Sequence, residues 1–173
     1  MNAFEDWKPF VVCPKDRHPP KPRDLSHKDG LGDRLRSAAF AEFQAIKAFD
    51  WASRRFMDVP ASLRDEWANL VPVEQRHYEW IAHRMQELGV DPAARPVSLR
   101  LWYSLAECET GKDFCIRIAS AEERGRLAGL HLIEVMKDRD KRTVEIFQKI
   151  VDEELDHVAV ANRYFNWKPS VGY

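Results

Sequence analysis

The sequence predicts an all-α protein that folds as a four-helix bundle, and three observations support this fold class. Apolar residues recur at steps of three and four over four long stretches, as on the buried face of a helix. Residues that favour turns separate the first stretch from the second and the third from the fourth. A glutamate followed by a Glu-x-x-His motif occurs in the first half of the chain and again, eighty residues later, in the second half.

Composition and charge limit the classes of partner. At 173 residues the chain is long enough for one domain with a sizeable core. The net charge of −1 gives no reason to expect nucleic acid or an anionic membrane as a partner. No apolar run approaches the ~20 residues that span a bilayer, and the acidic start is unlike a signal peptide. Three cysteines without a Cys-x-x-Cys spacing suit a reducing compartment, so we expect a cytoplasmic protein.

The N-terminal segment, residues 1–29, is expected to be an irregular arm because it holds five of the ten prolines. Four of its apolar residues favour docking of the arm onto the rest of the protein: Trp7, Phe10, Val11 and Val12. We expect residues 30–166 to form the bundle and residues 167–173 to form a short tail.

The first pair of helices is predicted on either side of a turn at residues 58–60. The first helix covers about residues 33–56, and the second follows Pro60 and ends near Leu88, just before Gly89. One face of the first helix carries apolar residues and a glutamate at helical spacing: Leu35, Ala38, Ala39, Glu42, Ala45, Ile46 and Phe49.

The second pair is predicted over about residues 112–137 and 141–165, with a turn at residues 138–140. Residues 90–111 connect the two pairs, and the apolar stretch Leu99–Tyr103 allows a short helix there. If a two-fold axis relates the pairs, the second and third helices run parallel. The connection then has to cross the length of the bundle, which about 22 extended residues can do.

The repeated motif supplies four carboxylates and two imidazoles, all within predicted helices: Glu42, Glu74, His77, Glu122, Glu154 and His157. In each half, the point midway between the two glutamates falls in the predicted turn, at residue 58 and at residue 138. Each pair of helices therefore places its glutamates at one level, ~24 Å from its turn at 1.5 Å per residue. The histidine three residues after the second glutamate lies on the same face of its helix.

Such a set predicts a site for two metal ions. Buried carboxylates with a total charge of −4 would be severely destabilising alone, and two divalent cations neutralise them. Carboxylate oxygens with one imidazole per ion suit iron or manganese, so we expect two iron ions or a manganese–iron pair. Solvated surface charges are the alternative for any one of these residues. Apolar neighbours weigh against it for the whole set: Phe43, Ile46, Ile118, Leu155 and Val158.

On these residues, residues 33–165 resemble the ferritin-like di-iron carboxylate superfamily. The stretches 122–125 and 153–158 further resemble a bacterial family of largely uncharacterised ferritin-like proteins, and the tRNA-hydroxylase branch shares the ligand pattern. The resemblance implies a ferritin-like bundle of two antiparallel hairpins joined by a long crossover. It also implies that Glu74 and Glu154 bridge the ions, that Glu42 and Glu122 are terminal ligands, and that each histidine binds one ion.

Relatives carry an acidic residue just before each Glu-x-x-His motif, where it orients a ligating histidine. Glu153 fills this place on the fourth helix and is expected to face His77. Val73 occupies the equivalent place on the second helix, so His157 needs another partner, for which Asp50 is a candidate.

The function implied by the resemblance is activation of O₂ or peroxide to oxidise or hydroxylate a small organic substrate. Iron handling (as a ferroxidase, a storage protein or a peroxide scavenger) is the first alternative, and a non-catalytic metal-binding bundle is the second. A homodimer is expected; the sequence assigns neither the electron donor nor a catalytic residue.

Residues near the predicted site have simpler interpretations as well. For Arg84 we favour a salt bridge, with Glu134 as a partner, over binding of an anionic substrate; for Tyr164 we favour ordinary packing over electron transfer. Small residues flank the glutamates and either leave a cavity or allow close helix packing: Ala38, Ala39, Ala45, Ala119, Gly125 and Gly129.

Overall fold

A computed structural model describes residues 7–169; the first six residues of the predicted arm and the last four of the predicted tail lie outside the described residues. The described chain is all-α, as predicted, apart from one isolated bridge between Val12 and Val97. Its five helices are α1 (Gly30–Arg55), α2 (Ala61–Glu87), α3 (Arg100–Ala106), α4 (Gly111–Met136) and α5 (Lys141–Phe165). Each long helix begins and ends within three residues of its predicted bounds.

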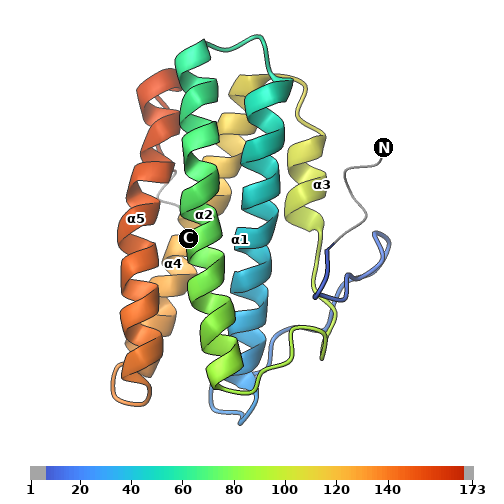
Figure 1. Cartoon of the computed structure of the whole chain (residues 1–173), viewed down its shortest axis with the longest axis vertical. Helices are drawn as coiled ribbons and strands as arrows, with labels where there is room; N and C mark the ends of the chain where they lie inside the picture. The colour runs from blue at the N-terminus through green and yellow to red at the C-terminus, as the bar shows by residue number, and fades with distance from the viewer. Residues whose placement is uncertain (1–6, 170–173) are drawn as a thin grey trace.

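Four long helices lie side by side, and α3 is a shorter helix on the outside of the bundle (Figure 1). The closest partners are α1 with α2 and α4 with α5, each pair joined by a short turn. The segment between α2 and α4 returns along the bundle, and its helix α3 packs against α1 and α4 (Figure 1). None of the described helices is long and apolar enough to span a membrane.

The start of α4 is held against the turn between α1 and α2. The backbone N–H of Gly111 donates to Asp58 Oδ2 at 2.9 Å, and the Thr110 hydroxyl accepts from the N–H of Asp113 at 3.1 Å. A Cβ atom at Gly111 would overlap the side chain of Val59, so only glycine permits this approach. The contact fixes the height of one helix pair relative to the other.

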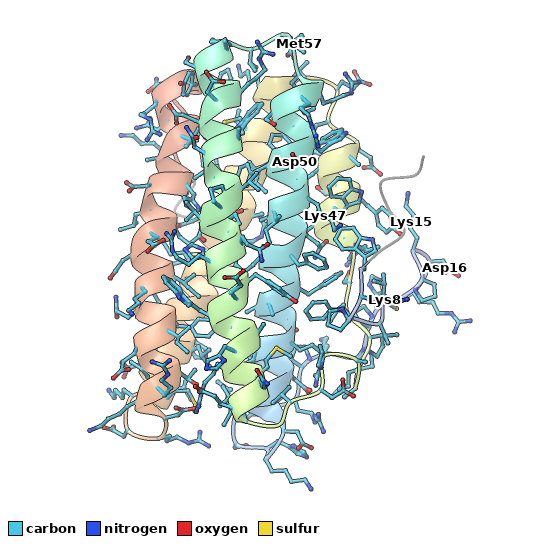
Figure 2. The ribbon with its side chains drawn as sticks, in the orientation of Figure 1. Lys8, Lys15, Asp16, Lys47, Asp50 and Met57 are labelled. Carbon is cyan, nitrogen blue, oxygen red and sulfur yellow. The ribbon has the colours of Figure 1, made fainter. Side chains whose placement is uncertain are left out.

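The N-terminal arm docks on α1 through Trp7 and Phe10, as predicted, whereas Val11 is 48% exposed and does not take part. The rings of Trp7 and Phe10 lie 5.6 and 4.9 Å from the ring of Phe40, and both arm residues are buried. Lys47 on α1 lies over the Trp7 ring at 5.1 Å (Figure 2). The arm also pairs with the crossover, because the N–H of Cys13 donates to the carbonyl of Val97 at 2.8 Å.

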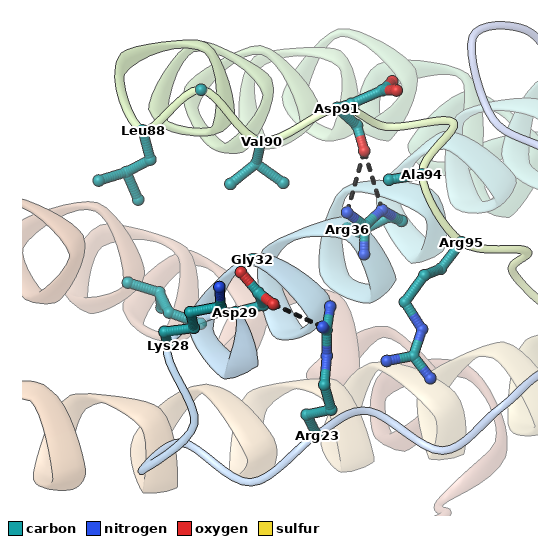
Figure 3. Close-up of a pocket in the computed structure, with 12 residues that line it drawn as sticks. Arg23, Lys28, Asp29, Gly32, Arg36, Leu88, Val90, Asp91, Ala94 and Arg95 are labelled. Carbon is teal, nitrogen blue, oxygen red and sulfur yellow. Dashed lines mark hydrogen bonds and ion pairs between the residues drawn. The ribbon is translucent and has the colours of Figure 1, made fainter.

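A second set of contacts, made by Asp33, joins the arm, α1 and the crossover. The Asp33 side chain is only 3% exposed. Three arginines donate to this carboxylate: Arg23 from the arm, Arg36 from α1 and Arg95 from the crossover. We refer to these four residues as the Asp33 cluster. The three arginines border a hollow that Leu88, Val90 and Asp91 also line (Figure 3). Hydrogen bonds from Arg23 hold the pKa of Asp33 well below its usual range, despite the opposing effect of burial.

Candidate metal centre

The structure brings all six predicted ligands together, each about halfway along its helix. They come from α1 (Glu42), α2 (Glu74 and His77), α4 (Glu122) and α5 (Glu154 and His157). Five of them are buried, with 0–8% of their surface exposed. Glu42 is the exception, since 13% of its side chain remains exposed. The position of each turn predicts how far along its helix pair the ligands lie, and the side chains meet at that distance.

Two carboxylates each span both imidazole rings. Glu74 places Oε2 3.6 Å from His77 Nδ1 and Oε1 2.8 Å from His157 Nδ1. Glu154 places Oε1 3.2 Å from His77 Nδ1 and Oε2 3.3 Å from His157 Nδ1. The ring centroids of the two histidines are 5.7 Å apart. Both carboxylates thus present one oxygen atom to each histidine.

The remaining two glutamates differ in how closely they join this centre. Glu42, Glu74, His77 and Glu154 each offer a ligand atom, and these four atoms lie within 4.8 Å of one another. This buried group can hold a metal ion. His157 and Glu122 are outside this group of four. His157 Nδ1 nevertheless lies 2.8 Å from Glu74 Oε1, and Glu122 is buried beside the group, where the charges of Glu154, Glu74 and Glu42 all act on its carboxyl.

The hydrogen bonding of the centre is incomplete. Both oxygens of Glu74, both oxygens of Glu154 and Nδ1 of each histidine are buried and make no hydrogen bond of acceptable geometry, in spite of the short distances between them. Buried polar atoms are nearly always paired, because an unpaired one loses its interactions with water without replacement. All six atoms carry lone pairs that a cation can accept, so the donor set fits a metal centre.

Without metal, the centre balances its charge with protons. Burial raises the pKa of Glu42 and of Glu122 well above the usual range, and the neighbouring carboxylates add to this effect. Burial opposes ionisation of Glu74, but the imidazoles of His157 and His77 lower its pKa to about 2. Burial also lowers the pKa of each histidine, yet Glu154 and Glu74 outweigh it and raise both values to about 10. Metal ions would replace these protons.

Glu153 lies where a residue that orients His77 is expected. Its Oε2 atom is 3.0 Å from His77 Nε2 and also accepts from Arg76 Nη2 at 2.6 Å. The interpretation of Asp50 as the corresponding partner of His157 is wrong. Asp50 is exposed on α1 and pairs with Arg54 (Figure 2).

Arg84 forms a salt bridge as expected, but the predicted partner is wrong. Its guanidinium contacts Asp140 at 2.8 Å and Glu87 at 2.7 Å, whereas Glu134 is exposed and pairs with Lys137. Asp140 caps the start of α5, next to the end of α2, and this places it within reach of Arg84. Tyr164 donates to Glu66 at 2.8 Å near the end of the bundle, which agrees with a packing role.

A groove of about 300 Å³ reaches the centre between α1, α4 and α5, and both Glu42 and Glu154 line it. The two glycines of α4 differ here. A Cβ atom at Gly129 would lie 2.7 Å from Val151, so this glycine allows close packing; a Cβ atom at Gly125 would meet nothing within 4 Å. The sequence allowed either a cavity or close packing beside these small residues. There is open space beside Gly125 and close packing beside Gly129. Sequence reasoning missed the buried residues of α5 that form the floor of the groove, because these read as ordinary core.

Comparison with known proteins assigns a family without a function. No curated protein and no solved structure matches this chain. The model of one family, described as "Protein of unknown function (DUF455)", matches residues 6–170, a stretch that includes all six predicted ligands. The chain therefore belongs to the DUF455 family.

Proposed function

We propose that this protein is a ferritin-like di-iron carboxylate oxidoreductase that uses O₂ or peroxide to oxidise or hydroxylate a small organic molecule. The observation that carries the proposal is the buried centre in which Glu74 and Glu154 each span both histidines while their oxygens lack hydrogen-bond partners. The two helix pairs and the connection that returns along the bundle support the ferritin-like arrangement.

In this proposal the six residues hold two iron ions, or one manganese and one iron ion. Glu74 and Glu154 bridge the ions, His77 and His157 bind one ion each, and Glu42 and Glu122 complete the set. Iron bound here would supply redox chemistry toward O₂ or peroxide. The chain contributes an environment with little water, and it orients His77 through Glu153.

The groove favours oxidation of an organic substrate over the iron-handling alternative. A path for iron would be lined by carboxylates, since these bind the hard cation as it enters. Instead, the walls are mainly apolar and include the cationic Arg34, and the two carboxylates in the lining belong to the metal centre itself. Hydroxylation by O₂ inserts one oxygen atom into a C–H bond and releases the other as water. That reaction also consumes two electrons and two protons, whereas hydroxylation by hydrogen peroxide balances without a reductant, because one peroxide oxygen enters the C–H bond and the other leaves as water.

Metal analysis of protein purified from iron-supplemented cells tests the centre directly. We expect about two iron ions per chain, as six ligands of this type bind in related bundles. A content well below one ion per chain would refute a di-iron centre. Mixing the reduced protein with oxygenated buffer should then produce a transient optical absorption in stopped-flow measurements. Gel filtration separates the alternatives further, because a large shell would favour iron storage and a small oligomer would not.

A further inference from the structure

The groove between α1, α4 and α5 leads from the metal centre to a cationic end. We infer that it binds an amphipathic organic anion of about ten non-hydrogen atoms, with its apolar end toward Glu42 and Glu154 and its anionic group beside Arg34. This inference rests on the proposed function, and it assigns a class of substrate to the same site.

The body of the groove is apolar. Its floor consists of buried side chains from α4 and α5: Leu132, Phe147, Ile150 and Val151. Small residues on α1 and α4 keep the walls apart, notably Ala38 and Gly125. Gly125 lies three residues after Glu122 and four before Gly129, so it belongs to the stripe of α4 that faces the other helices. Its Cβ position is nevertheless empty, and the groove therefore opens at this point.

The two ends of the groove differ in chemistry. Glu42 and Glu154 lie at the inner end, and Arg34 and His131 line the outer part. Arg34 precedes Glu42 by eight residues, so the two positions are ~12 Å apart along α1. The guanidiniums of Arg34 and Arg139 both act on the carboxylate of Asp24, so two cationic side chains lie near the outer end.

These dimensions define the ligand. A volume of about 300 Å³ holds about ten non-hydrogen atoms, at about 30 Å³ each. Apolar walls select a hydrocarbon body, and a guanidinium selects a carboxylate or a similar anion at one end. The opposite end of the ligand then presents its C–H bonds to the metal centre.

Octanoate has the required size and charge, and octan-1-ol is a neutral probe of the same chain length. We expect iron-loaded full-length protein to bind octanoate in isothermal titration calorimetry. Arg34→Gln should weaken octanoate binding about tenfold, because a charged hydrogen bond is lost. The same substitution should leave binding of octan-1-ol unchanged, since the alcohol does not need a cation.

Gly125 provides a second variant with a matched control. The aromatic ring of Gly125→Phe can enter the groove without displacing any atom near the Cβ position, so it should block both probes. Gly125→Ala adds only a methyl group, so it should weaken binding of both probes far less than Gly125→Phe does. Replacing an exposed helical glycine favours the helix in both variants, and circular dichroism should confirm that both fold.

Octanoate binding that survives Gly125→Phe would overturn the inference. Binding that depends on iron but not on Arg34 would also overturn it, because the carboxylate would then lie at the ions. Iron content is measured on the same samples. Failure to bind octanoate at full iron content contradicts the substrate class alone, whereas absence of iron contradicts the proposed function.

Discussion

Two buried clusters of charged residues in this protein have opposite compositions. In the Asp33 cluster one carboxylate accepts five hydrogen bonds of 2.7–3.0 Å from Arg23, Arg36 and Arg95. In the metal centre four carboxylates meet two imidazoles, and six buried atoms have no hydrogen bond of acceptable geometry. Donors are in excess in the first cluster and acceptors in the second.

This difference separates a cluster of paired charges from one that could hold a metal ion. The Asp33 cluster is complete within the chain, and it joins three segments that are distant in sequence. The metal centre is incomplete within the chain, because its lone pairs converge without enough donors. Burial of charge is common to both clusters, so burial alone does not identify a ligand site. The excess of unpaired acceptors is what favours a cation site here, since cations or protons are needed to satisfy it.

The largest effect is expected when one carboxylate of the metal centre is removed. Glu154→Ala deletes both oxygens that face the two histidines, and we expect the variant to lose nearly all bound iron while keeping its helical content. Metal analysis and circular dichroism measure the two outcomes. Asp156→Ala is the matched control, because Asp156 is an exposed carboxylate two residues away on α5. Full iron content in the Glu154 variant would show that the ligand set is wrong.

The Asp33 cluster should respond in the opposite way. Asp33→Asn leaves three guanidiniums around a neutral amide, and we expect the free energy of unfolding to fall by about 3–5 kcal/mol with iron binding retained. Urea unfolding and metal analysis test this. Asp29→Asn is the control, because Asp29 pairs with the same Arg23 at 2.6 Å but its side chain is 46% exposed. It should cost under about 1 kcal/mol. Equal losses in both variants would contradict a structural role for Asp33.

The sequence predicts the metal centre and the long helices because both follow a regular spacing. Glu42 and Glu122 lie on apolar helical faces, and the turns near residues 58 and 138 set their level. A ligand set of this kind can be predicted from residue spacing alone. Helix geometry converts the number of residues between two ligands into a distance along the helix axis and an angle around it. The level of the ligands therefore needed no knowledge of side-chain packing.

The Asp33 cluster and the groove could not be predicted in this way. Arg36 has the i,i+3 spacing of a helix from Asp33, but Arg23 and Arg95 lie 10 and 62 residues away, and these two separations follow no period. They depend on how the arm and the crossover fold over the end of α1. Gly125 and Gly129 are equally small and both line the groove, and only the local distance between helices leaves space beside the first and a close contact beside the second.

The last effect we predict is a pH dependence that differs between the clusters. In metal-free protein the pKa of His77 and of His157 is raised to about 10 from an ordinary value of 6.5. A raised pKa in the folded state stabilises the protein below the unfolded value, and this stabilisation is lost as the pH rises through the folded value. The free energy of unfolding should therefore fall by at least about 1 kcal/mol between pH 6.5 and pH 10.

Urea unfolding in the presence of a chelator measures this decline, and iron-loaded protein is the control because metal replaces the protons on both rings. Asp33 has a lowered pKa, so its contribution is present above the ordinary value for aspartate and is lost as the pH falls. The two clusters should therefore weaken the metal-free protein at opposite ends of the pH scale. Asp33→Asn should lower stability at all pH values above the ordinary aspartate pKa, and it should remove the decline on the acid side while leaving the alkaline decline in place. An alkaline decline of equal size in iron-loaded protein would mean that the histidines do not exchange protons for metal.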